Sequence, residues 1–208
     1  TPLYSSAASD VYKRQVQVRL AILQRALIHT DVTEQNLGPI ANALATLDVI
    51  SREKSASWFQ THIAQLHKLL EKSLGSDKPA LLDAARPVLE RMFSVLPAAP
   101  PSDEEKSETP SDEQAAFCTF AEGIIQEGFK NGTNLYSVLT LLAAWSHDRK
   151  DVLDRYLAQL IKLLTKLTKE HLGAALAPGA TSPAPPANGA DPTLKLLLMV
   201  LELSLIHI

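Results

Sequence analysis

The clearest helical pattern in the chain is DRKDVLDRYLAQLIKLLTKLTKEHLG, residues 148–173. Its apolar residues recur at the three- and four-residue spacing of one helix face. They are Val152, Leu153, Tyr156, Leu157, Leu160, Leu164 and Leu167. The residues on the opposite face are basic, namely Arg155, Lys162, Lys166 and Lys169. This pattern predicts a long amphipathic helix, with Asp148 as its N-cap and Gly173 at its end.

The same periodicity recurs through most of the chain. Aromatic residues make up only 5% of it and there are 8 glycines, a composition that favours helices over strands. We therefore expect an all-α protein of about eight antiparallel helices. They cover approximately residues 16–29, 33–52, 55–75, 76–96, 111–131, 133–145, 148–173 and 191–202.

Local signals predict where these helices begin and end. The expected starts are Asp31 or Thr33, Ser55 or Ser57, Ser76, the Ser111–Gln114 capping box, Thr133, and Asp191 followed by Pro192. The expected ends include Gly75 and the Asn131-Gly132 pair. Pro39 lies close enough to the start of its predicted helix to be tolerated, and Pro79 falls in a first turn. Pro87 falls inside a helix, where it costs about 3 kcal/mol that packing has to offset.

The domain organisation follows from two changes in composition. Residues 97–111 are polar and acidic and are predicted to be a disordered loop, and residues 174–190 form a flexible loop rich in Pro, Ala and Gly. Between them we expect helical repeat pairs over residues 16–96, repeat helices over 112–173 and a truncated helix over 191–202. The pairs recur about every 40 residues, close to the ~40–47 residues of HEAT repeats. The sequence thus predicts a HEAT/TPR-like α-solenoid fragment.

Both ends of the chain resemble translated sequencing adapter. Residues 5–15, SSAASDVYKRQ, back-translate without mismatch to a transposase-type adapter, and the reverse complement of its end encodes LSLIHI, residues 203–208. We therefore expect residues 1–15 and 203–208 to be adapter artefact, with both natural termini missing. Without these residues the terminal apolar run is too short for the ~20 residues of a membrane span.

Charge and cysteine content narrow the class of protein. The net charge is −3, or −4 without the adapter residues, so a nucleic-acid-binding surface is not expected. Cys118 is the single cysteine, which excludes an intrachain disulfide and is typical of a reducing compartment.

No motif for catalysis, cofactor binding or metal binding was found, so we assign no site residue, no cofactor and no small-molecule substrate. His62 and His67 lie five residues apart, roughly 140° around a helix, and are interpreted as solvent-facing or capping histidines. Cys118 is interpreted as a small buried hydrophobe. Trp58 and Trp145 are expected in the core, with an exposed anchor for a partner as the alternative.

Two motifs keep a second interpretation. Asn131-Gly132-Thr133 matches a glycosylation sequon but is better explained as a helix-terminating turn. Ser102 precedes three acidic residues and Thr109 precedes Pro110, so phosphorylation of the acidic loop is a hypothesis beside that of an unregulated surface insertion.

Two stretches, residues 23–97 and 156–172, resemble the helical-repeat region of the transformation/transcription-domain-associated protein family. The likeness includes the phrases HKLLEKSL (67–74) and LTKEHL (167–172), and the two loops resemble fungal-type insertions. These proteins are very large scaffolds of the phosphatidylinositol-3-kinase-related class, with an inactive kinase-like domain far C-terminal to the repeats.

The resemblance implies a nuclear, non-catalytic adaptor of histone acetyltransferase coactivator complexes such as SAGA. Its partners would be other subunits of the complex and transcription activators, with no direct nucleic acid and no membrane. The alternatives are a HEAT segment of a checkpoint kinase, nuclear transport receptor or phosphatase scaffold, and an enzyme that binds a small ligand between helices.

Overall fold

The computed structural model describes residues 18, 21, 25, 31–52, 54–95, 112–147, 149–175 and 192–207, and all of its regular elements are helices. They are α2 (Leu37–Ser51), α3 (Ala56–Ser76), α4 (Pro79–Val95), α5 (Asp112–Asn131), α6 (Leu135–Ser146), α7 (Lys150–Ala175) and α8 (Pro192–His207). Of the predicted first helix, only Val18, Ala21 and Arg25 are described, and they are helical and exposed. The predicted loops at 97–111 and 174–190 lie outside the described residues, except for 174 and 175. The all-α expectation is confirmed.

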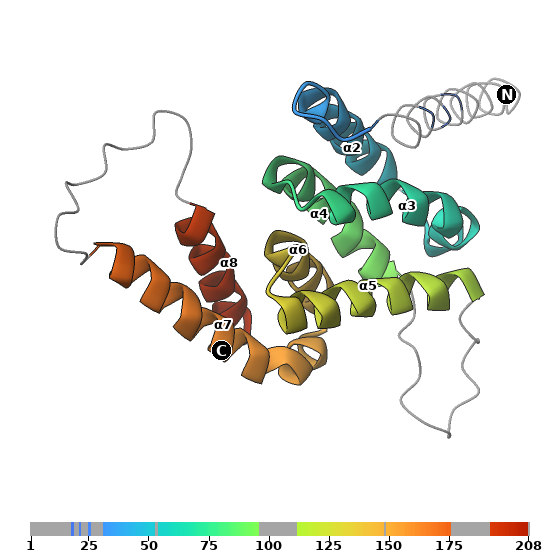
Figure 1. The fold of residues 1–208 in the computed structure, drawn as a ribbon. Helices are drawn as coiled ribbons and strands as arrows, with labels where there is room; N and C mark the ends of the chain where they lie inside the picture. Colours follow the sequence, from blue (N-terminus) through green and yellow to red (C-terminus); the bar gives the residue numbers. More distant parts are fainter. Residues whose placement is uncertain are drawn as a thin grey trace, which may run out of the picture.

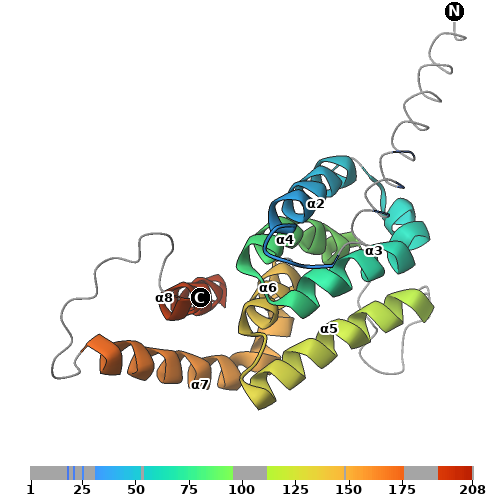
Figure 2. The same ribbon diagram turned by 45° about the horizontal axis from the view of Figure 1, so that its top comes forward.

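The helices form the two layers of an α-solenoid (Figures 1 and 2). In one layer α2 packs on α4, α4 on α6, and α6 on α8; in the other α3 packs on α5. Contacts between the layers join α3 to α4, α5 to α6, and α7 to both α6 and α8. Each helix thus covers the apolar stripe of its neighbours, which is how repeat proteins build a continuous core.

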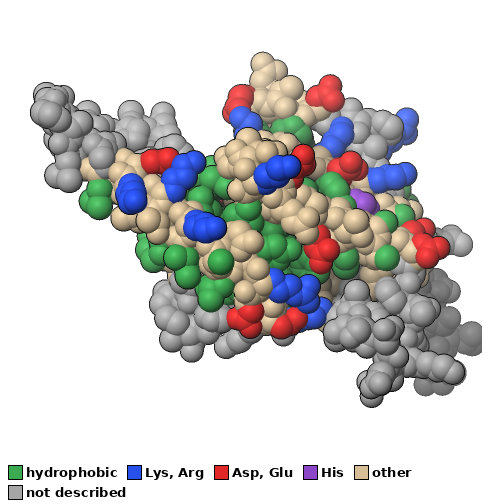
Figure 3. Space-filling view, turned by 60° about the horizontal axis from the view of Figure 1, so that its bottom comes forward, with side chains coloured by type: hydrophobic (Ala, Val, Ile, Leu, Met, Phe, Trp, Pro, Cys, Tyr) green, Lys and Arg blue, Asp and Glu red, His purple; other side chains and the backbone are tan. Residues whose placement is uncertain are grey.

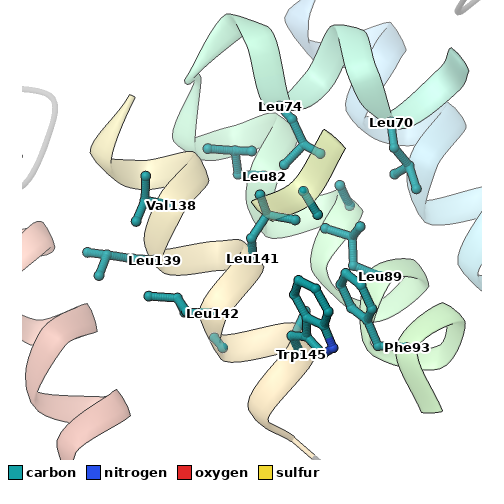
Figure 4. Close-up of a cluster of buried hydrophobic side chains, with 14 of the residues drawn as sticks. Leu70, Leu74, Leu82, Leu89, Phe93, Val138, Leu139, Leu141, Leu142 and Trp145 are labelled. Carbon is teal, nitrogen blue, oxygen red and sulfur yellow. The ribbon is translucent and has the colours of Figure 1, made fainter. Parts of the chain in front are cut away.

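The centre of the core is α6. Each of its residues from Ser137 to Ser146 is buried. Figure 4 shows Leu139 and Leu141 pointing to opposite sides of α6, with Leu141 on the side of α4. The rings of Phe93 and Trp145 stack with centroids 4.7 Å apart and planes at 5°. A helix that is apolar all round has to be covered on every side. The other helices therefore pack around α6.

The second helix begins later than the caps at Asp31 and Thr33 predict. Its first residue is Leu37, and Asn36 precedes it without a side-chain cap. The physical reason is Pro39, which has no backbone N–H to donate. The first backbone bond that can form after it is from Ile40 N to the Asn36 carbonyl, at 3.0 Å.

The turn between α3 and α4 also differs from the prediction. Gly75 does not end α3, which continues to Ser76, and Asp77 takes the left-handed conformation with φ 49°. The Asp77 carboxylate accepts a hydrogen bond from Ser137 N at 2.8 Å, and Ser137 Oγ lies 2.9 Å from it. The same hydroxyl donates to the Leu74 carbonyl at 2.6 Å. These contacts across 60 residues explain why the helix turns at Asp77.

The start of α6 is Leu135 rather than Thr133. Asn134 precedes it in the left-handed region, with φ 52°, and provides no side-chain cap. The first turn is capped instead by Asp77, whose carboxylate also interacts with the backbone of Tyr136. The cap of α6 therefore comes from a different helical hairpin, which no local pattern could indicate.

Two helices extend past their predicted ends. Gly173 does not close α7, which continues to Ala175 because alanine is the best helix former. The stripe of α7 also contains Leu163, which is buried but was missing from the prediction. The last helix, α8, runs past Glu202 to His207, with Leu203 buried. α8 thus includes residues 203–207 of the stretch that was predicted to be adapter.

Two other predictions are confirmed, one about a helix end and one about a proline inside a helix. Asn131 ends α5, and Gly132 follows with φ 69° and donates its N–H to the Gly128 carbonyl at 2.8 Å. Pro87 lies inside α4, and its ring is exposed. The predicted caps Ser111, Asp148 and Asp191 lie outside the described residues.

Candidate interaction surfaces

The two histidines predicted to face solvent or to cap a helix are both half-buried in aromatic surroundings. His62 Nδ1 lies 2.8 Å from the Trp58 carbonyl, and its ring stacks on Trp58 with centroids 4.5 Å apart. His67 packs against Phe117 and Phe120 of α5. Neither ring therefore faces solvent freely: Trp58 of the same helix covers His62, and Phe117 and Phe120 of α5 cover His67.

Cys118 lies on α5 and is half-buried. Burial raises the pKa of its thiol, Glu122 raises it further, and Arg149 opposes both. A reactive cysteine needs the reverse shift, toward the thiolate. The environment of Cys118 therefore favours packing over nucleophilic chemistry.

The tryptophans differ in their exposure. Trp145 is buried in the core against Phe93, as expected. Trp58 is half-buried at the edge of the core, with its ring edge-on to Phe59 at 5.1 Å. Only Trp58 presents part of its indole to solvent.

A polar groove of about 640 Å³ lies along the edge where α2, α4 and α6 end. Most of its lining residues are at or beyond the C-terminal ends of these helices. They are Asp48, Arg52, Lys54, Pro87, Glu90, Arg91, Ser94, Val95 and His147. Basic residues at this edge complement the negative ends of three helix dipoles.

Several charged groups of the groove already have partners within the chain. Arg52 Nη2 lies 2.7 Å from Asp48 Oδ2, and this hydrogen bond raises the pKa of the Arg52 guanidinium. Arg91 donates to the Arg52 carbonyl, and Glu90 accepts from Arg86 Nε at 2.8 Å. General acid–base chemistry needs groups whose environments separate their pKa values. The paired charges fit a docking edge better than a reactive centre.

A smaller hollow of about 260 Å³ lies where the α5–α6 turn faces α7. Phe129, Leu135 and Leu163 contribute its apolar lining, and Lys162 and Lys166 stand beside them. Lys166 Nζ lies 3.8 Å from Glu170, a loose surface pair. This hollow could accommodate one apolar side chain.

Exposed apolar side chains are the other surface feature. The large ones within the described residues include Val49 (63% exposed), Ile161 (55%), Leu172 (51%), Leu198 (57%) and Leu201 (42%). Figure 3 shows hydrophobic side chains over the middle of one face, with charged side chains of both signs around them. Apolar surface of this kind is typical of faces that contact other protein.

Sequence reasoning missed both hollows. The groove joins Asp48 to His147, and the smaller hollow joins Phe129 to Lys166. Neither set forms a motif at close spacing, so only the packing of the helices brings the residues together. Ser102 and Thr109 of the acidic loop lie outside the described residues.

The described residues contain no group of three His, Cys, Asp or Glu side chains that could hold a metal ion. None of the helices described is long and apolar enough to cross a bilayer.

Comparison with known proteins identifies the family. The chain matches the family described as the Tra1 HEAT repeat ring region over residues 3–208, a range that includes most of the first predicted adapter stretch and all of the second. No solved structure matches it.

Two relatives are subunits of acetyltransferase complexes. The SAGA complex/NuA4 acetyltransferase complex subunit TRA1 of Saccharomyces cerevisiae is 26% identical over 171 residues, which are 82% of this chain and 4% of the relative. The corresponding subunit of Schizosaccharomyces pombe is 22% identical over 192 residues, 91% of this chain and 5% of the relative. This chain thus spans about a twentieth of their length. The family match confirms the resemblance seen in the sequence: the chain belongs to the Tra1 HEAT repeat ring region family.

Proposed function

We propose that this chain is a non-catalytic scaffold segment of a nuclear histone acetyltransferase coactivator subunit. The observation that carries the proposal is the family match over residues 3–208, which includes every described helix. The names of both relatives place them in SAGA and NuA4 acetyltransferase complexes. The two-layer stacking of α2 to α8 gives the extended surface through which scaffolds of this type bind other proteins.

The mechanism is geometric. Core packing around α6 fixes the helices, so the groups on their outer surface are held at constant positions for a partner. The polar groove at the ends of α2, α4 and α6 provides a charged edge, and Leu198 and Leu201 provide apolar contact area. The partners are other subunits of the complex and transcription activators, bound through protein–protein contacts.

Affinity purification of the polypeptide that contains this segment tests the proposal. The polypeptide is tagged in the organism that carries the gene, and the bound proteins are identified by mass spectrometry. We expect acetyltransferase subunits and histone acetylation activity to co-purify. Recovery with a nuclear transport or phosphatase assembly, or as a monomer, would contradict the proposal.

A pair of glycine variants links the result to this segment. Gly128→Ala disturbs the packing of α5 on α6, whereas Gly123→Ala faces open space. We expect the first to reduce the recovery of subunits that dock on these helices and the second to leave it unchanged. Equal recovery for both variants would show that the folded segment does not hold a partner.

A further inference from the structure

Two ion pairs connect helices that are not neighbours in their layer. Within the layer α6 lies between α4 and α8. Lys195 Nζ of α8 nevertheless lies 3.0 Å from Asp83 Oδ2 of α4. Glu202 of α8 accepts a hydrogen bond from Arg86 Nη2 of α4 at 2.9 Å. The side chains therefore bridge across α6.

The same residues have further contacts that orient them. Arg86 Nε also donates to Glu90 at 2.8 Å, so one guanidinium binds carboxylates of both helices. Lys195 Nζ stands 5.8 Å from the centre of the Tyr136 ring, on α6. One ammonium group thus contacts all three helices, which favours a defined geometry over incidental surface pairing.

The course of the layer changes where the bridge lies. In Figures 1 and 2, α2, α4 and α6 are stacked in a row, and α8 lies to one side of α6 instead of continuing that row. Axes of packed helices are typically 8–10 Å apart, so in a flat layer α4 and α8 would be separated by about twice that distance. Closing both ion pairs to about 3 Å is easier when the layer is bent toward the bridge.

We propose that Asp83, Arg86, Lys195 and Glu202 form an electrostatic clasp that sets the bend of the layer at α6. The side chains of the four residues are between 30% and 63% exposed, so salt reaches and screens them. When the clasp is weakened, α8 swings away from α4 about α6, and α7 moves with α8 because the two helices pack together. The direction of the solenoid past α6 thereby depends on ionic strength.

Distance measurements between two spin labels test the clasp. Cys118 is first replaced by alanine, and cysteines are introduced at Val49 of α2 and Leu198 of α8, both exposed. The distance is measured in the full chain at low and high salt. We expect a longer and broader distribution at high salt, and the same change at low salt in Asp83→Lys.

Charge exchange separates electrostatics from packing. The double variant Asp83→Lys/Lys195→Asp reverses the pair and is expected to restore the short distance. Asp151→Lys is the matched control, because Asp151 pairs with Arg149 and Arg155 near the start of α7 and does not bridge α4 and α8. It should leave the distance unchanged.

Hydrogen exchange gives an independent measurement. Loss of one exposed pair should accelerate exchange of the α8 amides by up to about fivefold. An unchanged distance in Asp83→Lys, or a double variant that is not restored, would overturn the clasp. If the charge-reversed chain does not fold, the clasp is tested by the salt titration of the labelled chain without charge reversal. A label distance that does not change with salt would also overturn the clasp.

Discussion

At the scale of single residues, Asp77 has the most informative environment. It lies between α3 and α4 but caps the first turn of α6, whose own N-cap position offers no side-chain bond. Burial raises the pKa of Asp77, and hydrogen bonds from Ser137 and Tyr136 only partly oppose this. The ionised carboxylate therefore binds the α6 amides at a net desolvation cost.

Substitutions of Asp77 should separate the gain from capping α6 from the cost of burying a charge. Asp77→Ala removes the cap and is expected to lower the free energy of unfolding by about 0.5–2 kcal/mol. In Asp77→Asn the amide oxygen can accept the same hydrogen bonds without a charge, so we expect a smaller loss. Urea denaturation of both variants measures the difference, and equal losses would contradict the capping role.

The pH dependence of Asp77 has a defined sign. Because its pKa is raised in the folded state, its contribution to stability is fully present below the pKa of the unfolded chain and is lost as pH rises through the higher, folded pKa. The stability of Asp77→Asn relative to the unmodified chain should therefore increase from acidic to neutral pH. The reverse trend would show that the dipole at the α6 N-terminus outweighs the burial of the carboxylate.

At the scale of elements, the approach of α5 to α6 depends on Gly128. A Cβ built on this residue would overlap Val138 Cγ2 and lie 3.0 Å from the Thr133 carbonyl. The two helices can pack this closely only because Gly128 has no side chain. Gly123, on the same helix, faces open space.

The two glycines give a matched pair of stability variants. Gly128→Ala is expected to destabilise the chain by about 1–3 kcal/mol through overpacking. Gly123→Ala should stabilise it by about 0.5–1 kcal/mol, because alanine is the better helix former. Thermal or urea unfolding measures both, and a stable Gly128→Ala variant would mean that α6 can shift away without loss.

Pro87 gives a second prediction about an element. It lies inside α4 with its ring exposed, so its replacement by alanine loses little packing and adds an N–H for the Asp83 carbonyl. Pro87→Ala should increase stability by up to about 3 kcal/mol. Pro79→Ala, at the first residue of α4, should have little effect. A loss of stability in Pro87→Ala would show that the neighbouring helices require the backbone geometry that proline imposes there.

At the scale of the whole molecule, exposed leucines determine how the chain behaves alone. Leu198 and Leu201 lie three residues apart on α8, at one end of the layer, and are 57% and 42% exposed. A repeat helix with an uncovered apolar face tends to associate. We therefore expect the isolated chain to self-associate or aggregate.

Light scattering at increasing protein concentration tests this prediction. Leu198→Gln/Leu201→Gln should reduce association, whereas Ala158→Gln, at an exposed position of α7, should not. If the unmodified chain remains a monodisperse, cooperatively melting monomer, the prediction of self-association is contradicted.

Much of the fold could be predicted because it depends on local pattern. The stripe of residues 148–173 predicts α7 nearly to its end, and the glycine after Asn131 predicts the end of α5. Gly75 and Thr133 were misplaced as boundaries because Asp77 and Ser137, 60 residues apart, fix the α3–α4 turn and the first turn of α6. The hollows could not be predicted, since their lining residues come from different helices.

Residue patterns alone establish that this protein is built of amphipathic helices and which repeat family it resembles, because helix periodicity and short phrases are properties of neighbouring residues. Only the tertiary structure decided which helices share a layer, that α6 is buried on every side, and that Asp83 and Arg86 meet Lys195 and Glu202 more than 100 residues away. The physical reason is that layer order and ion pairs across a helix depend on how apolar faces fit together in space, and residue spacing along the chain does not encode that fit.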